Sequence, residues 1–383
     1  MKVPYSSLDT PAVLMDMGKL EANIREMSQL AAEAGVKLRP HTKIHESALI
    51  AKWQIEAGAR GVEVGPLDQA EALAGEGFDD ILVAHPFYGR HKLERLKRLL
   101  GKPGLKITVV VDMFEQAENI SKVGEAVGRK IPMLLKIETG GNRYGVLPGE
   151  SALKLARKLC QLSGVEFMGI YVHEMGAEPT AEGVDKKAFE VLSVVSETAK
   201  MLSLEGIKTE HVSVGASPTF RSTCRYLKEK RFREITEIHP GSCVIGDMRY
   251  VTGFAMTEGK CALTVLASVM STSHSDHAVL DAGGKTLGVD PIIERRETPG
   301  FFWEGKPSFG SIRGRPDLRL GRLSAETSCV YYKDPKKKLS IGERLEIVPN
   351  NAIIVINIHD HVYGVRNGEV AMVIPITGRG RGN

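Results

Sequence analysis

The sequence predicts an α/β protein that consists of a (β/α)8 TIM barrel followed by a mainly antiparallel β domain. Three observations favour this fold class. The 383 residues, of which 42% are hydrophobic, suit two domains with sizeable cores. Short runs rich in Val and Ile alternate with amphipathic helical patterns up to about residue 248. Beyond that point, strand patterns follow one another and are separated by turns.

Eight short apolar runs are the expected barrel strands, and helical patterns lie between them. The runs are residues 12–16, 37–40, 61–64, 81–84, 107–112, 133–137, 168–172 and 211–214. The first helical pattern places Leu20, Ile24, Met27 and Ala31 on one face. No Gly-rich dinucleotide-binding turn follows the first run, so the pattern favours a closed barrel over an open doubly wound sheet.

The region after residue 248 reads as a series of strands with no convincing helix. The expected strands are residues 261–271, 277–283, 327–332, 343–348, 352–358 and 362–366. The expected domains are therefore residues 8–248 for the barrel and residues 249–383 for the β domain. Residues 1–7 could join the β domain.

Composition excludes several classes of partner. Lys and Arg exceed Asp and Glu by four and form no basic stripe, so nucleic acid is not an expected partner. The longest apolar runs are far shorter than the roughly 20 residues that cross a bilayer, and the N-terminus has no apolar signal core, so no membrane association is expected. Five scattered cysteines without CxxC spacing fit a cytoplasmic protein.

Lys43 is the first candidate catalytic residue. It lies in the segment 39–45, just after an early barrel strand, and barrel enzymes place reacting groups at the carboxyl ends of their strands. A lysine that is desolvated there has a lowered pKa and can form a Schiff base. Taken alone, such a lysine is more often a solvated surface residue, so a catalytic role needs support from other segments of the chain.

Two turns rich in small residues follow consecutive strands and suit a phosphate group. Residues 213–219 offer backbone N–H groups with the hydroxyls of Ser217 and Thr219, and residues 237–242 end in Gly241 and Ser242. The loops after the last two strands are the usual phosphate site of this fold.

Arg143 lies in a Gly-flanked turn after an earlier strand. A cation fixed there could face an anionic oxygen of a cofactor.

Five ordered motifs resemble one enzyme group over nearly the whole chain. They are RPHTKIHES, ETGGNRYGV, SVGASPT, EIHPGSCVIGD and VLDAGGKTLGVD. In this order and spacing they are similar to the fold-type III pyridoxal-phosphate enzymes of the D-threonine aldolase, D-serine dehydratase and 3-hydroxy-D-aspartate lyase group, which shares its barrel with alanine racemase.

The resemblance implies a set of roles for residues of this chain. It implies that pyridoxal 5'-phosphate (PLP) is the cofactor, that Lys43 forms the Schiff base and that Arg143 contacts the phenolic oxygen. The phosphate is expected at Ser217, Thr219, Gly241 and Ser242. His173 stands where relatives have a Tyr or His facing the ring, and it is the second candidate catalytic residue. The resemblance also implies an amino acid substrate and a homodimer.

One departure from the resemblance concerns a metal. Relatives carry a His-x-Cys or His-x-Asp pair of ligands, and at these two positions this chain has Asn351 and Ile353. Isoleucine offers no ligand atom and an amide is a poor ligand for Zn²⁺ or Mn²⁺. We therefore expect no bound metal and an activity that survives chelation.

Histidines elsewhere in the chain are not expected to replace this metal site. His359 and His361 would share a face if both lay on one strand, but hydrogen-bonded or solvated roles are commoner for such residues. His274 and His277 fall in a polar turn and are expected to face solvent.

The leading functional hypothesis is a PLP-dependent lyase, namely a D-3-hydroxy-amino-acid aldolase or dehydratase. A metal-independent amino acid racemase or epimerase is the alternative, and the missing metal pair makes it more attractive. A non-catalytic PLP-binding protein is a third hypothesis, which the strand-rich C-terminal region opposes because such proteins are single barrels.

Overall fold

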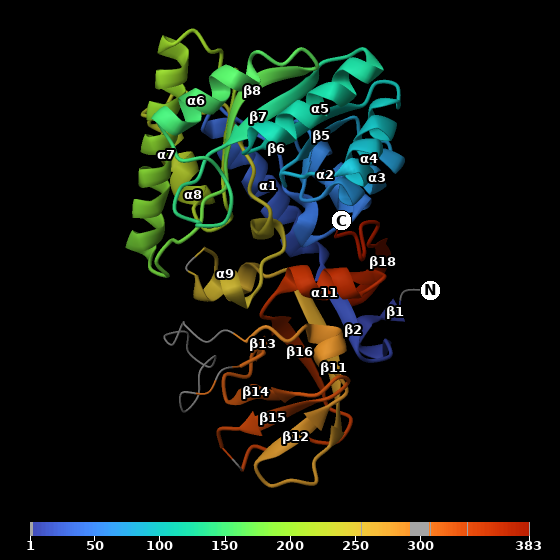
Figure 1. Ribbon diagram of the computed structural model, residues 1–383. Coiled ribbons are helices and arrows are strands. Elements are labelled where there is room, and N and C mark those ends of the chain that lie inside the picture. Colours follow the sequence, from blue (N-terminus) through green and yellow to red (C-terminus); the bar gives the residue numbers. More distant parts are fainter. Residues whose placement is uncertain (1–2, 254, 292–305, 307, 335, 383) are drawn as a thin grey trace. The chain divides into compact units, whose positions relative to one another are not determined.

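A computed structural model describes residues 3–253, 255–291, 306, 308–334 and 336–382. The chain separates into two compact units (Figure 1). One unit contains an antiparallel sheet and comprises the described residues of Met1–Ile24, Ile44–Leu49 and Ser242–Gly380. The other contains a parallel barrel and comprises those of Arg25–Lys43, Ile50–Gly241 and Arg381–Asn383.

The barrel has eight parallel strands in the order β3-β10-β9-β8-β7-β6-β5-β4. They are β3 (Lys37–Leu38), β4 (Val62–Val64), β5 (Asp80–Val83), β6 (Lys106–Val111), β7 (Ile131–Lys136), β8 (Val165–Val172), β9 (His211–Val214) and β10 (Glu237–Ile238). A parallel bridge between His41 and Glu63 joins the two ends of this order, and the N–H of Arg60 donates to the carbonyl of Leu38 at 2.8 Å. The sheet is therefore closed, and the predicted (β/α)8 fold is confirmed.

Helices alternate with the barrel strands along the chain and lie on the outside of the curled sheet (Figure 1). They are α1 (Met17–Glu33), α2 (Ala48–Glu56), α3 (Leu67–Gly75), α4 (Arg90–Leu100), α5 (Phe114–Val127), α6 (Glu150–Leu159), α7 (Ala181–Leu204) and α8 (Phe220–Lys228). The apolar face predicted for α1 is buried at all of its positions, namely Leu20, Ile24, Met27 and Ala31. This burial is the expected result of apolar residues spaced at the helical period.

The antiparallel sheet has the order β1-β18-β17-β2-β11-β12-β15-β14, and β16 joins it by pairing with β11 and β13. Its strands are β1 (Val3–Pro4), β2 (Ala12–Asp16), β11 (Leu263–Ser271), β12 (His277–Leu280), β13 (Gly310–Ile312), β14 (Leu318–Leu323), β15 (Ser328–Tyr332), β16 (Arg344–Pro349), β17 (His361–Arg366) and β18 (Glu369–Pro375). The pair β17 and β2 is parallel, whereas the other pairs of described strands in this sheet are antiparallel. The prediction of a mainly antiparallel β domain is confirmed.

The prediction for residues 12–16 is wrong in one respect. Ala12–Asp16 forms a strand as expected, but this strand, β2, pairs with β11 of the antiparallel sheet, where Val13 lies opposite Val265. The eighth barrel strand is Glu237–Ile238. A strand buried on both faces has the same apolar pattern in either sheet, and two residues are too short for a periodic pattern.

The strand predicted for residues 352–358 is also wrong, because Ala352–Ile358 is the helix α11. Ala352, Val355 and Ile356 are buried at a helical spacing, whereas Ile354 is exposed. The Asp247 carboxylate, far away in the sequence, accepts the N–H of Ala352 at 2.9 Å and caps the helix. Such a long-range cap overrides the strand preference of a run rich in Ile and Val.

The expectation of no helix after residue 248 fails at two further places. They are α9 (Met248–Thr252) and α10 (Gly284–Leu287), which contain five and four residues. Helices of one turn carry too little periodic pattern to be predicted. Among the described residues, the structure shows no helix with the length and apolar character that a membrane span requires.

Candidate active site

The predicted site residues of the barrel unit follow the carboxyl ends of five of its strands. Lys43 lies in the short 3-10 helix η2 (Thr42–Ile44) after β3, and His173 directly follows β8. The others are Arg143 after β7, Ser217 and Thr219 after β9, and Gly241 after β10. Because the strands of a parallel barrel all point the same way, these residues share one end of the barrel. Ser242 follows in the chain as the first residue of the other unit and begins η3 (Ser242–Val244).

Lys43 is partly buried, and its ammonium group is in an environment that disfavours charge. Desolvation lowers the pKa of Lys43, and the nearby charge of Arg143 lowers it further, although Glu63 acts in the opposite direction. The Lys43 backbone N–H donates to Nδ1 of His41 at 3.3 Å, which ties η2 to the preceding strand end. These effects make the unprotonated amine, which is the nucleophilic form of a lysine, easier to form than in water.

Glu63 is a fully buried carboxyl in the middle of β4 that sequence reasoning missed. Its Oε1 accepts the Tyr171 hydroxyl at 2.8 Å, and its Oε2 has no hydrogen-bond partner. Nε2 of His41 lies 3.7 Å from Oε1, and Nδ1 of His239 lies 3.8 Å from Oε2. Desolvation raises the pKa of Glu63 to about 8. The carboxyl therefore holds a proton at neutral pH.

Lys136 is a second buried lysine that sequence reasoning missed, at the end of β7. Its Nζ lies 4.5 Å from the centroid of the Tyr171 ring and 4.7 Å from that of Tyr144. Desolvation lowers the pKa of Lys136 to about 8. The signal in the sequence was a single charged residue inside an otherwise apolar strand, as it was for Glu63.

His239 directly follows β10 and contacts side chains of β8 and β9. Its ring stacks on Tyr171 with centroids 4.4 Å apart and planes 10° apart, and Nδ1 lies 2.8 Å from Oγ of Ser213. Desolvation lowers the pKa of His239 to about 3, so the imidazole is neutral. Its Nε2 has no hydrogen-bond partner. The ring of His173 lies 6.4 Å from that of His239, and desolvation lowers the pKa of His173 well below its usual value.

Buried ion pairs of Arg39, which follows β3, join this strand to β10 and β5. Arg39, which is fully buried, donates from Nε to Oε2 of Glu237 at 3.0 Å and from Nη1 to Oδ1 of Asp80 at 2.7 Å. Burial alone would raise the pKa of Glu237, but Arg39 and His211 lower it to about 2. This pair is charged and fully bonded, unlike Glu63.

The loop that carries Arg143 has a defined local cause. Oε1 of Glu138 accepts the backbone N–H groups of Gly140 at 2.6 Å and Asn142 at 3.1 Å. The loop closes at Gly145, whose φ of +130° favours glycine. The Arg143 guanidinium lies over the Tyr144 ring at 4.5 Å, so it is placed beside Lys136.

The structure brings the two predicted phosphate turns together. The N–H of Gly241 donates to Oγ of Ser217 at 3.2 Å. A Cβ at Gly241 would lie 2.7 Å from the carbonyl oxygen of His41, so only glycine fits there. Small residues of this kind leave the backbone open to a bound anion.

Glu174 is an unexpected carboxyl beside the same turns. Its Oε2 contacts the Thr219 hydroxyl, whereas its Oε1 has no hydrogen-bond partner. Desolvation raises the pKa of Glu174 to about 8, and Lys187 acts weakly in the opposite direction. Below that pH the carboxyl is neutral and can donate a hydrogen bond, and above it the group is an anion. Glu174 follows His173 in the sequence, and nothing in the local pattern marks it as buried.

Asn351 and Ile353, at the positions that the resemblance aligns with metal ligands, make contacts within the antiparallel unit or lie in a helix. Nδ2 of Asn351 donates to Oδ2 of Asp290 at 2.6 Å, and Asn351 occupies the N-cap position of α11. Ile353 lies in α11. His359 and His361 do not share a strand, since His359 ends α11 and His361 begins β17. Nε2 of His359 lies 3.2 Å from the carbonyl oxygen of Thr286. The premise for a ligand pair at His359 and His361 is therefore wrong.

Comparison with known proteins gives two family matches. Residues 15–249 match the family described as alanine racemase, N-terminal domain, and residues 262–365 match the putative serine dehydratase domain. The chain is 30% identical to a 3-hydroxy-D-aspartate aldolase from Paracoccus denitrificans, over 98% of this chain and 94% of that protein. It is 28% identical to a D-threonine aldolase from an Arthrobacter species, with the same coverage.

Solved structures of similar proteins cover the whole chain. A D-threonine aldolase from Filomicrobium marinum has a TM-score of 0.85 and 29% identity, and the match covers 99% of this chain and 98% of that one. A variant of a D-threo-3-hydroxyaspartate dehydratase has a TM-score of 0.87 and 26% identity, with 98% and 97% covered. Another variant of a dehydratase with the same name was solved in the metal-free form.

Proposed function

Because the chain belongs to the alanine racemase N-terminal domain family, we propose that it is a PLP-dependent lyase that cleaves or dehydrates a D-3-hydroxy amino acid. The observation that carries this proposal is the cluster of ionisable side chains around Lys43, at the barrel end where enzymes of this fold react. The similarity to aldolases and dehydratases extends over both units of the chain, which supports the lyase class.

The side chains at this end of the barrel fit the cofactor that the family implies. Bound PLP supplies an electron sink for negative charge that develops at Cα of an amino acid. A lysine with a lowered pKa suits covalent attachment, and we assign this role to Lys43. Oε2 of Glu63 and Nε2 of His239 are buried polar atoms without a protein partner, as expected where a polar ligand belongs.

We assign the phosphate to Ser217, Thr219, Gly241 and Ser242. Gly241 supports this assignment. Its close approach to His41 leaves no room for a side chain, and a turn without side-chain bulk lets an anion reach the backbone. We assign the phenolic oxygen of the cofactor to Arg143, whose guanidinium lies over the Tyr144 ring.

The reaction needs an acid–base group near the β-hydroxyl of the substrate, and we propose His173 for this role. The group would accept the hydroxyl proton in an aldolase or donate a proton to the leaving hydroxide in a dehydratase. His173 lies at the mouth of the barrel, and its lowered pKa keeps the imidazole neutral and able to accept a proton. The lowered pKa of Lys43 favours its unprotonated amine, the form that can accept a proton from Cα.

A metal-independent racemase or epimerase is the second candidate, and Asn351 and Ile353 favour it. Racemisation leaves Cβ untouched and needs only acid and base groups on the two faces of Cα, one of which Lys43 can supply. Without metal ligands at the two aligned positions, a reaction at Cβ depends on a side-chain base such as His173.

A panel of D- and L-amino acids separates these reactions. We expect release of glycine with an aldehyde, or of ammonia, from D-3-hydroxy amino acids and not from their L-isomers. Loss of optical rotation without either product would establish the racemase. Binding of PLP without any turnover would establish a non-catalytic protein. This hypothesis is the least favoured, because the chain has an antiparallel unit in addition to the barrel.

We also propose that the protein is a cytoplasmic homodimer. All five cysteines are free thiols, which fits a reducing compartment. The dimer rests on the family resemblance alone, and light scattering coupled to size-exclusion chromatography tests it.

A further inference from the structure

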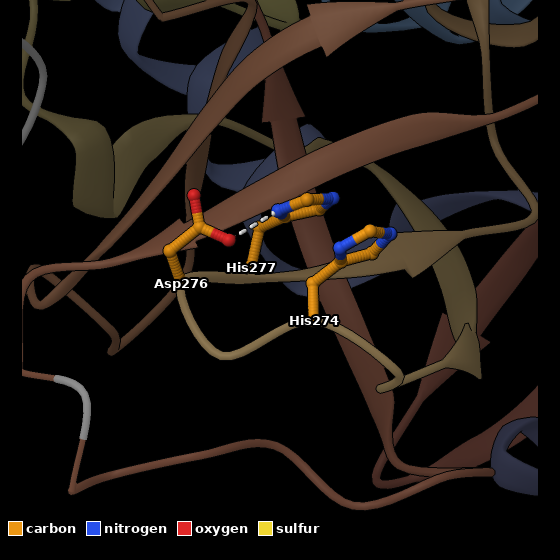
Figure 2. A group of neighbouring side chains, drawn as sticks. All are labelled: His274, Asp276 and His277. Carbon is orange, nitrogen blue, oxygen red and sulfur yellow. Dashed lines mark hydrogen bonds and ion pairs between the residues drawn. The ribbon is translucent and has the colours of Figure 1, made fainter.

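Two histidines and an aspartate gather in the connection between β11 and β12 (Figure 2). The rings of His274 and His277 stack with centroids 4.4 Å apart and planes 14° apart. Oδ1 of Asp276 lies 2.8 Å from Nδ1 of His277. One ligand atom from each of the three residues lies within 4.8 Å of the others. None of these three residues is among those to which we assign the lyase reaction.

The sheet holds two members of this cluster in place. His277 is the first residue of β12 and lies opposite Tyr331 of β15, and the two rings are 5.3 Å apart. The carbonyl oxygen of Asp276 accepts the N–H of Tyr332 at 3.0 Å. His274 and Asp276 are exposed, so their side chains can turn at little cost, whereas His277 is partly buried. The prediction that both histidines face solvent therefore applies fully to His274 alone.

We propose that His274, Asp276 and His277 form a binding site for a divalent transition-metal ion of the Zn²⁺ class. Two imidazoles and one carboxylate are a common ligand set for Zn²⁺, and a water molecule can complete a tetrahedron. Zinc–ligand bonds of about 2.0–2.1 Å place tetrahedral ligand atoms roughly 3.3 Å apart. Oδ1 of Asp276 and Nδ1 of His277, at 2.8 Å, are closer than this spacing, and rotation of the exposed Asp276 and His274 side chains can bring all three ligand atoms to it.

The ligand atoms also predict which ions should bind weakly. Ca²⁺ and Mg²⁺ prefer oxygen ligands and gain little from imidazole nitrogen, so they should bind weakly. Cu²⁺ should bind at least as tightly as Zn²⁺, because affinity rises along the divalent series up to copper. A bound ion would link the turn to the edge of β12 and so stabilise the folded unit by mass action.

Calorimetric titration of the chelator-treated holoprotein with ZnCl2 tests the proposal. We expect one equivalent of Zn²⁺ to bind, and both His274→Ala and His277→Ala to weaken the affinity at least about tenfold. Asp276→Asn should weaken it less, because the amide oxygen is a poorer ligand. His91→Ala, which removes an exposed histidine on α4, and His361→Ala are matched controls that should keep the affinity of the unaltered chain.

Two results would overturn the site. One is an unaltered chain that takes up no stoichiometric Zn²⁺. The other is a Zn²⁺ affinity that is unchanged in His274→Ala and His277→Ala, or that is lost in His361→Ala. His274 is exposed, so its variant should fold even if the His277 variant does not. A second readout is Tm, which ZnCl2 should raise in the unaltered chain and in His91→Ala but not in His274→Ala.

Discussion

The two units bury polar side chains in different ways around their candidate ligand positions. In the barrel, Glu63 and Glu174 are buried carboxyls, each with an oxygen that has no hydrogen-bond partner and a pKa raised to about 8. In the antiparallel unit, the corresponding side chains are neutral amides. Nδ2 of Asn351 donates to Asp290 and Nδ2 of Asn350 donates to the carbonyl oxygens of Asp290 and Ser308, both at 2.8 Å, while Oδ1 of each amide is also buried without a hydrogen-bond partner.

This difference indicates which unit carries the chemistry. The fold keeps ionisable groups in the barrel in protonation states that water would not favour, which is typical of reactive sites. At the positions that the resemblance aligns with metal ligands, the antiparallel unit has a neutral amide, Asn351, which donates to Asp290, and an isoleucine within α11. We therefore place the reacting groups in the barrel, and the following predictions test that division.

The largest effect is expected at Gly241, in the phosphate turns of the barrel. Gly241→Ala adds a Cβ that would lie 2.7 Å from the carbonyl oxygen of His41, so the turn has to move. We expect the affinity for PLP to fall roughly 100-fold, which corresponds to about 2.7 kcal/mol. Titration of the apoprotein with PLP, followed by absorbance, measures this. Gly75→Ala is the matched control, because a Cβ there meets nothing within 4 Å.

An unchanged affinity for PLP in a folded Gly241→Ala variant would show that these turns do not bind the phosphate. The assignment of Ser217 and Thr219 would then fall with it, since Ser217 accepts the N–H of Gly241.

A smaller effect is expected at Glu174. Above a pH of about 8 its carboxylate would repel a phosphate dianion near Thr219, so PLP affinity should fall as pH rises through this value. Glu174→Gln removes the charge, and we expect it to bind PLP about tenfold more tightly than the unaltered chain above that pH. Both proteins should bind PLP similarly near pH 7. Parallel pH profiles would show that Glu174 does not face the phosphate.

Glu63 should make the stability of the fold depend on pH. Its folded pKa of about 8 exceeds the ordinary value of 4.5, so the folded state holds a proton that the unfolded state has lost between these values. The free energy of unfolding should therefore decrease as pH rises across this window, by on the order of 1 kcal/mol per pH unit. Urea unfolding of the apoprotein at several pH values measures this slope.

Glu63→Gln should remove that contribution and leave the similar one from Glu174. An equal slope in both proteins would mean that Glu63 is ionised in the folded state.

No effect on turnover is expected from chelation. Asn351 and Ile353 cannot replace the metal ligands of relatives, and the proposed zinc site at His274, Asp276 and His277 is separate from the assigned reaction groups. The rate with a D-3-hydroxy amino acid should be the same before and after exhaustive dialysis against a chelator. Loss of turnover that Mn²⁺ or Zn²⁺ restores would contradict the division between the two units.

The sequence predicted the barrel because its strand and helix periods differ clearly, as the buried face of α1 illustrates. It could not assign Ala12–Asp16 to the correct sheet, because pairing partners such as Leu263–Leu266 are distant in the sequence. It misread Ala352–Ile358, since the cap from Asp247 exists only after folding.

The candidate site was predicted to a similar degree. Motifs in loops predicted roles for Lys43, Arg143 and the phosphate turns, and these roles stay predictions. Glu63, Lys136 and His239 were missed, because their importance depends on burial, and one charged residue within an apolar strand does not reveal whether its side chain points into the barrel.

Borohydride reduction of the PLP-loaded protein, followed by peptide mapping, tests the central claim most directly. The treatment fixes the cofactor to the lysine that holds it, and the barrel end contains two lysines with lowered pKa values, Lys43 and Lys136. We predict that the pyridoxyl group is found on Lys43, in the peptide that contains His41 and Thr42. A pyridoxyl group on Lys136 or on any other lysine, or a protein that is not labelled at all, would contradict the account.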